Sequence, residues 1–256
     1  MSSLPASVRL ALWATASYAG RLPLEEVMDR ALPDVDDVRG DVDRLALWRD
    51  LGERVVLVAL PRPGDLSGMP RGSADLIAAA TEAGECVFVP GIGGALVPTI
   101  ESFGPEGDQG TQVTWTAYDA EPVPVHTLEA LSLNEVDLRF RQELAEQTRQ
   151  IDALDAKPWS GSGARARADQ WVHPRGWGLP DGLPQRALRV LSSASLVSLG
   201  TELGLTISSP ALTSATDERR RVLLTSLLAS ADRAVATAAT VGALSLAGMR
   251  PGREDA

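Results

Sequence analysis

The sequence has few of the side chains that enzymes most often use as nucleophiles, general bases or metal ligands. Its 256 residues include one cysteine (Cys86), one lysine (Lys157) and two histidines (His126 and His173). A lone cysteine excludes an intrachain disulfide, and these few side chains cannot supply a four-ligand Cys/His zinc site. Lys157 precedes Pro158 and lies in no glycine-rich phosphate loop, so there is no P-loop signature. We therefore expect no cofactor and no metal.

The sequence also lacks a hydrophobic segment that is both long and strongly apolar. The run 10–19 is rich in alanine, and its pattern is more typical of an amphipathic helix than of a signal peptide. The uncharged run 234–249 is too short and too weakly apolar to span a bilayer, which needs about 20 strongly apolar residues. Together with the single cysteine, these features predict a cytoplasmic protein that does not enter a membrane.

Acidic residues outnumber basic ones, and the excess lies in the first half of the chain. The net charge is −10, and residues 1–130 hold 20 acidic and 9 basic side chains. This half should repel nucleic acid, and residues 1–54 contain no basic recognition helix, so nucleic-acid binding is not expected. The preference for arginine over lysine is explained by high-GC codon usage.

The hydrophobic pattern predicts an α/β or α+β domain. Helices are expected near 5–19, from Pro23, and at 41–51, with an acidic linker from residue 33 to 38. The apolar runs 55–60 and 86–89 predict buried strands joined by a loop and a helix over 74–83, a βαβ-like order that allows a parallel pair.

The second part of the chain predicts a hairpin followed by a helical layer. Alternating residues favour a hairpin of 95–103 with 112–118, giving a small mixed sheet of about four strands. Helices are expected from Ser132 to about 154, over 185–203 and over 216–248. We divide the chain into residues 1–155, a Gly/Pro/Trp-rich loop 156–184, and a helical pair 185–250 that we assign to the same domain.

Two segments are candidates for a binding site. The first is the loop 61–72, which leaves a buried strand and leads to a helix N-terminus, a position where α/β proteins often bind anions. Its polar candidates are Arg62, Asp65, Ser67, Arg71 and Ser73. Alternatively, Asp65 and Arg71 pair with each other and only hold the loop.

The second candidate is the segment 158–184, which is basic and rich in tryptophan inside an acidic protein. Tryptophan faces and guanidinium groups can hold an anionic or aromatic ligand, or a partner surface. The candidate residues are Trp171, His173, Arg175 and Trp177. The alternative is a cover loop whose tryptophan rings fill the core.

Other patterns are weaker. Residues 90–94 follow a strand but lack the spacing of a dinucleotide fingerprint, so we interpret them as a glycine turn. The three arginines 219–221 hint at a phosphate or partner contact, with a solvated turn as the alternative. The Ala/Gly/Ser-rich face of 229–248 permits close helix packing, either within the chain or in a homodimer.

No activity can be assigned from these observations. Because general bases and nucleophiles are scarce, we favour a cytoplasmic, non-catalytic binding, regulatory or assembly protein whose partner is a small anion or another protein. The alternative is an enzyme acting on a small anionic substrate, for example a nucleotide-like one, that Arg62, Arg71 and Arg175 would bind.

Overall fold

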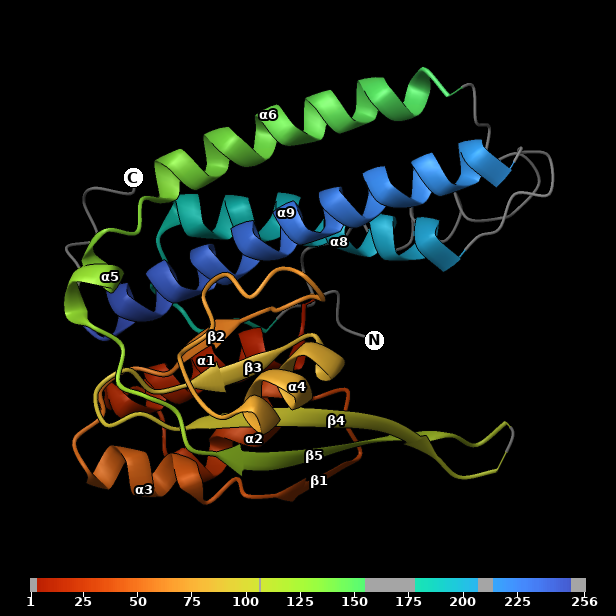
Figure 1. The fold of residues 1–256 in the computed structure, drawn as a ribbon. Coiled ribbons are helices and arrows are strands. Elements are labelled where there is room, and N and C mark those ends of the chain that lie inside the picture. The colour runs from red at the N-terminus through yellow and green to blue at the C-terminus, as the bar shows by residue number, and fades with distance from the viewer. Residues whose placement is uncertain (1–3, 106, 155–177, 207–213, 250–256) are drawn as a thin grey trace.

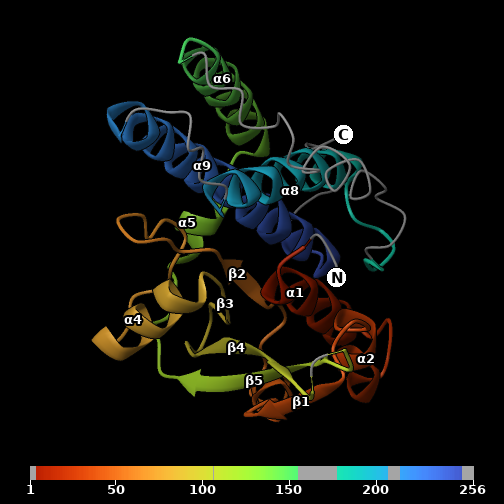
Figure 2. The same cartoon turned by 90° about the vertical axis from the view of Figure 1, so that its right-hand side faces the viewer.

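The protein combines a mixed sheet with a layer of long helices (Figure 1). The computed structural model describes residues 4–105, 107–154, 178–206 and 214–249. The five strands have the order β1-β5-β4-β3-β2, and Figures 1 and 2 show α6, α8 and α9 together on one side of the sheet. The predicted α/β class, N-terminal helices and C-terminal helical layer are confirmed, but the sheet has five strands rather than four.

Most elements begin and end close to the predicted positions. The N-terminal elements are α1 (Ala6–Tyr18), η1 (Leu24–Glu26), α2 (Val27–Ala31), β1 (Asp37–Gly40), α3 (Arg44–Asp50), β2 (Leu57–Ala59), α4 (Ala74–Ala83), β3 (Cys86–Phe88), β4 (Ala95–Phe103) and β5 (Gly110–Tyr118). The C-terminal helices are α5 (Val125–Glu129), α6 (Leu133–Asp152), α8 (Gln185–Thr206) and α9 (Ser214–Leu246).

The strand that the sequence analysis did not predict is β1, which overlaps the segment interpreted there as an acidic linker. β1 pairs in parallel with β5, far along the chain. Two aspartates at its ends bind the β5 backbone: Asp36 Oδ2 accepts from Thr111 N, and Asp41 Oδ2 accepts from Ala117 N, both at 2.8 Å. These carboxylates satisfy amide groups at the sheet edge. The linker prediction was wrong because the segment acquires its strand conformation from distant backbone, which local hydrophobic pattern does not reveal.

A glycine permits the close approach of β1 to β5. Gly40 has φ +88°, and a Cβ built on it would lie 2.0 Å from the carbonyl oxygen of Trp115. We expect Gly40→Ala to lower the free energy of unfolding by about 2 kcal/mol, through left-handed strain and displacement of the edge strand. Gly20→Ala, at φ +74° with no atom within 4 Å of the added Cβ, should lower it by only about 1 kcal/mol. Urea unfolding measures both, and equal effects would contradict the packing argument.

β2 and β3 are antiparallel, so the parallel pairing suggested by their βαβ-like order was wrong. Ala59, at the end of β2, pairs with Cys86, at the start of β3. The intervening loop and α4 therefore leave the sheet and return to it at the same end, without the crossover that a parallel pair requires. Gly84, at φ +74°, ends α4 and turns the chain directly into β3.

The glycine turn at residues 90–94 is confirmed. It joins the antiparallel strands β3 and β4, and Val89 N donates to Gly94 O at 3.1 Å. The chain continues as a strand instead of opening a helix, so no backbone amides are arranged for a dinucleotide pyrophosphate. This geometry agrees with the rejection of a Rossmann site.

The long helix α9 runs through the core and contacts α1, α6, α8 and β2 (Figure 2). Its small residues Ala231, Ala234 and Ala238 are buried, so the small-residue face is used for packing within the chain. Among the described residues, α9 alone is long and apolar enough to cross a membrane, but 67% of its most apolar window is buried inside the protein. Packing in the core accounts for its composition.

Candidate functional site

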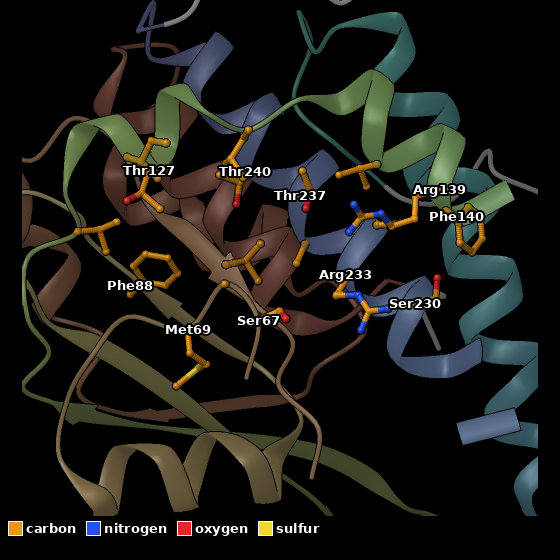
Figure 3. Close-up of a pocket in the computed structure, with 18 of the residues that line it drawn as sticks. Ser67, Met69, Phe88, Thr127, Arg139, Phe140, Ser230, Arg233, Thr237 and Thr240 are labelled. Carbon is orange, nitrogen blue, oxygen red and sulfur yellow. The ribbon is translucent and has the colours of Figure 1, made fainter. Parts of the chain in front are cut away.

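A pocket of about 340 Å³ lies between the sheet and the helical layer (Figure 3). Its volume is within the usual range for small-molecule sites. One wall comes from β2, β3 and the loop that follows β2, and the other comes from α5, α6 and α9. The pocket thus forms where the two halves of the chain meet.

One end of the pocket is apolar. Phe88 on β3 and Met69 on the loop lie at this end, opposite the arginines in Figure 3, and Leu128 of α5 adds to the lining. Phe88 and Leu128 are buried, and Met69 is half-buried. Such a surface favours aliphatic or aromatic groups because contact removes apolar area from water.

The opposite end is basic. Arg139 of α6 and Arg233 of α9 lie on the same side of the pocket in Figure 3. Arg233 pairs with Asp65 and, at 3.5 Å, with Glu143. Within the part of the chain that the structure describes, Arg139 forms no ion pair. This end therefore carries a guanidinium whose charge is not matched by a carboxylate of any described residue.

Hydroxyl groups lie between the two ends. Thr237 and Thr240 are one turn apart on α9, and Figure 3 shows both side chains directed toward the pocket. Ser67 approaches from the loop, and Thr127 of α5 also lines the pocket. These groups can donate or accept hydrogen bonds, which adds selectivity to an otherwise apolar surface.

The structure brings one of the predicted loop residues, Ser67, to this pocket, and a second, Asp65, contacts its lining residues Ser67 and Arg233. Asp65 accepts hydrogen bonds from Ser67 N at 3.0 Å and Oγ at 2.6 Å. Asp65 pairs with Arg233 rather than with Arg71, so the suggested Asp65–Arg71 pair is not formed. Partial burial tends to raise the pKa of Asp65, but the Ser67 hydrogen bonds and the Arg233 charge lower it overall. Asp65 is therefore an anchor for Arg233.

The other three loop residues lie elsewhere. Ser73 caps α4, where its Oγ accepts from Leu76 N at 3.1 Å. The side chain of Arg71 is exposed, and its carbonyl accepts from Glu121 N at 2.7 Å. Arg62 turns to the C-terminal helices and lines a different cavity. The loop thus does not form a single anion site.

Arg62 joins the loop to α8 and α9. Its Nε donates to Asp232 Oδ2 at 2.7 Å, and its Nη2 donates to Glu202 Oε1 at 2.8 Å. Ser198 Oγ donates to the other Asp232 oxygen at 2.8 Å. Burial raises the pKa of Asp232 despite the opposing Arg62 charge and hydrogen bonds. The Asp232 side chain is only 2% exposed, so Arg62 is its main compensation.

Glu85 is a buried carboxyl beside the same cavity and predicts a pH dependence of stability. Ser7 N donates to its Oε2 at 2.6 Å, yet burial raises its pKa above the ordinary 4.5. The folded state then binds the proton more tightly than the unfolded chain, so this contribution to stability is present at low pH and is lost as pH rises above about 4.5.

We expect Glu85→Gln to remove this loss, because glutamine keeps an acceptor for Ser7 N without a charge. Urea unfolding of the parent protein and the variant at about pH 5 and about pH 7.5 measures the difference in their free energies of unfolding. The variant should gain stability relative to the parent protein at the higher pH. An equal difference between the two proteins at both pH values would contradict a raised pKa for Glu85.

The candidates in the tryptophan-rich segment, Trp171, His173, Arg175 and Trp177, lie outside the described residues. Where the description resumes, Gly178 O accepts from Trp13 Nε1 at 2.5 Å, beside α1.

The sequence analysis missed most of the pocket's polar residues. Arg139 belongs to a strongly charged helix, where one more arginine carries no signal. Arg233 had a signal: Asp232 and Arg233 are the only charged residues between 222 and 249, in a helix otherwise suited to a core. Two adjacent charged side chains in a largely apolar helix need specific partners, because burying unpaired charges is unfavourable.

The chain resembles Rv1486c-like proteins over both of their domains. A sequence model of their N-terminal domain matches residues 7–129, and one of their C-terminal domain matches residues 134–236. Two Mycobacterium tuberculosis proteins, Uncharacterized protein MT1533 of strain CDC 1551 / Oshkosh and Uncharacterized protein Rv1486c of strain ATCC 25618 / H37Rv, are each 28% identical over 235 residues. Each alignment covers 75% of this chain and 80% of the relative. No solved structure matches the chain.

Proposed function

We propose that this protein, which resembles Rv1486c-like proteins along most of its length, binds a small amphipathic anion in the pocket between the sheet and the helical layer. The ligand would have an apolar body and a carboxylate or phosphate head. The observation that carries the proposal is a mainly apolar pocket with Arg139, which lacks an ion pair among the described residues, at one end.

The two ends of the pocket suit the two parts of such a ligand. The apolar body would cover Phe88 and Met69, with each buried methylene contributing about 0.8 kcal/mol. The head group would accept paired hydrogen bonds from the planar Arg139 guanidinium, which fits carboxylates and phosphates well. Arg233 would contribute less, because Asp65 and Glu143 already neutralise it.

We further infer a binding role rather than a catalytic one. The described lining contains no histidine or cysteine, and its one carboxylate, Glu143, pairs with Arg233. Cys86 is buried nearby, and burial raises its pKa to about 12, which keeps the thiol protonated. Binding without chemistry suits a carrier or a sensor of the ligand. We place this role in the cytoplasm, since the one cysteine of the chain is free.

Two ligands with the same chain and different heads test the proposal. Isothermal titration calorimetry would compare octanoate and octanol with the full-length protein. We expect octanoate to bind more tightly than octanol, because only the anion pairs with Arg139. Equal affinity for octanoate and octanol would contradict the role of charge, and no binding of octanoate would contradict the pocket.

A further inference from the structure

A second cavity, of about 280 Å³, lies on another face of α9. Asp232 and Val235 of α9 line it, whereas the first pocket uses Arg233 and Thr237 of the same helix. The remaining walls come from α8, from the start of α1, and from the chain on either side of α4. The two cavities are therefore separate sites with different lining side chains.

The charged groups of the second cavity are mostly acidic. Three carboxylates, on Glu85, Glu202 and Asp232, line it together with one guanidinium, that of Arg62. Arg62 binds Glu202 and Asp232, while Glu85 accepts from a backbone amide. Among the lining residues one positive charge thus faces three negative ones when all three carboxyls are ionised, and Arg9 of α1 adds a second positive charge near Glu85, so that the negative charges still exceed the positive ones and favour a further cation.

A buried hydroxyl without a partner among the described residues points independently to a ligand. Ser195 lines the cavity and is 2% exposed, and its Oγ forms no hydrogen bond with any residue that the structure describes. Ser193, on the neighbouring exposed side of α8, instead donates to Arg189 O at 3.0 Å, as helical serines commonly do. Buried polar atoms in native proteins are usually satisfied, so the Ser195 hydroxyl, once rotated toward the cavity, has a free hydrogen-bonding capacity for a group that enters it.

The end of α4 adds to the negative potential. Ala83 and Gly84, at its C-terminus, line the cavity. The carbonyl end of a helix favours positive charge. Arg62 reaches this end already, because a Cβ on Gly84 would lie 3.2 Å from its Nη1. A second cation in the cavity would also be attracted by the carbonyl end of this helix.

We propose that this cavity binds a small organic cation, a primary ammonium group on a short apolar chain. The ammonium would donate to Glu202, Asp232 and Ser195 Oγ, and the chain would contact Leu60, Leu199 and Val235. Three N–H donors match these three acceptors. An organic cation is favoured over a metal ion, since no group of three metal-ligating side chains occurs among residues with described positions.

Butylammonium, butyrate and butanol serve as probes for this proposal in calorimetric titrations of the full-length protein. Butylammonium should bind, and butyrate and butanol should bind at least tenfold more weakly, because only the ammonium carries the charge that the carboxylates attract. Binding of butyrate or butanol as tight as that of butylammonium, or no heat from butylammonium, would overturn the proposal.

Two variants locate the site. Ser195→Ala should weaken butylammonium binding about three- to tenfold without loss of thermal stability, because it removes a hydroxyl that forms no hydrogen bond with the described residues. The matched Ser193→Ala, outside the cavity, should leave the affinity unchanged. Glu202→Gln, with a half-exposed side chain, should weaken binding about tenfold. Unchanged affinity in both Ser195→Ala and Glu202→Gln would show binding elsewhere and overturn the assignment.

The proposals for the two cavities can be tested separately. Arg139→Gln should not change butylammonium binding, and Ser195→Ala should not change octanoate binding, since neither residue lines the other cavity. A single variant that abolished both would contradict two independent sites.

Discussion

Replacing Arg139 with glutamine should weaken octanoate binding about 10- to 100-fold. A hydrogen bond to a charged group typically contributes about 1.5–3 kcal/mol, and Arg139 would provide the charged hydrogen bonds to the head group. The side chain is exposed and forms no ion pair with any described residue, so its loss should leave the fold unchanged. Calorimetry gives the affinity, and thermal unfolding checks the fold.

Arg141→Gln is the matched control. Arg141 lies on the same helix and is also exposed, but it pairs with Asp137 at 2.8 Å and does not line the pocket. We expect this variant to bind octanoate as the parent protein does, because long-range attraction between exposed charges is weak at moderate salt. Equal losses in the two variants would attribute the effect to net charge and contradict a specific role for Arg139.

Arg62→Met should lower the free energy of unfolding by about 3–5 kcal/mol at neutral pH, because removing one partner leaves a buried charge uncompensated. Asp232, with 2% of its side chain exposed, would keep only the Ser198 hydrogen bond. Methionine fills much of the same volume, so the loss would come from the charge rather than from a void. Urea unfolding measures it.

The pH dependence of the variant's stability tests whether the uncompensated charge of Asp232 causes the loss. Burial already raises the pKa of Asp232, and without Arg62 it should rise further. A carboxyl with a raised pKa stabilises the folded state at low pH and loses that contribution as pH rises, so the variant's deficit should grow once the pH exceeds the raised pKa of Asp232 in the parent protein. Arg62→Met with Asp232→Asn should recover much of the stability at neutral pH. A double variant as unstable as Arg62→Met alone would contradict this explanation.

Local patterns were sufficient to predict most of the elements but not how they pair. The Ser73 cap and the Gly84 stop fixed α4 to the residue, because capping depends on neighbouring backbone groups. β1 was missed since Asp36 and Asp41 bind backbone about 75 residues away. The direction of β3 relative to β2 depends on the path of the loop and α4, which hydrophobic periodicity does not encode.

The sequence indicated one side of the candidate site and left the other unknown. The position of the loop after β2 predicted a ligand site there, and Ser67 does line the pocket. Arg139 and Arg233 reach the same pocket from α6 and α9, and that convergence depends on helix packing. Arg62 was chosen for its charge, but Asp232 draws it to the second cavity instead.

A thermodynamic cycle tests the central claim most directly. Octanoate and octanol would be titrated into the parent protein and into Arg139→Gln, and the four affinities give the coupling between the head group and Arg139. The account predicts that the substitution weakens octanoate binding by at least tenfold and leaves octanol binding unchanged. Equal losses for the two ligands, or no loss for octanoate, would contradict an anion-binding pocket built around Arg139.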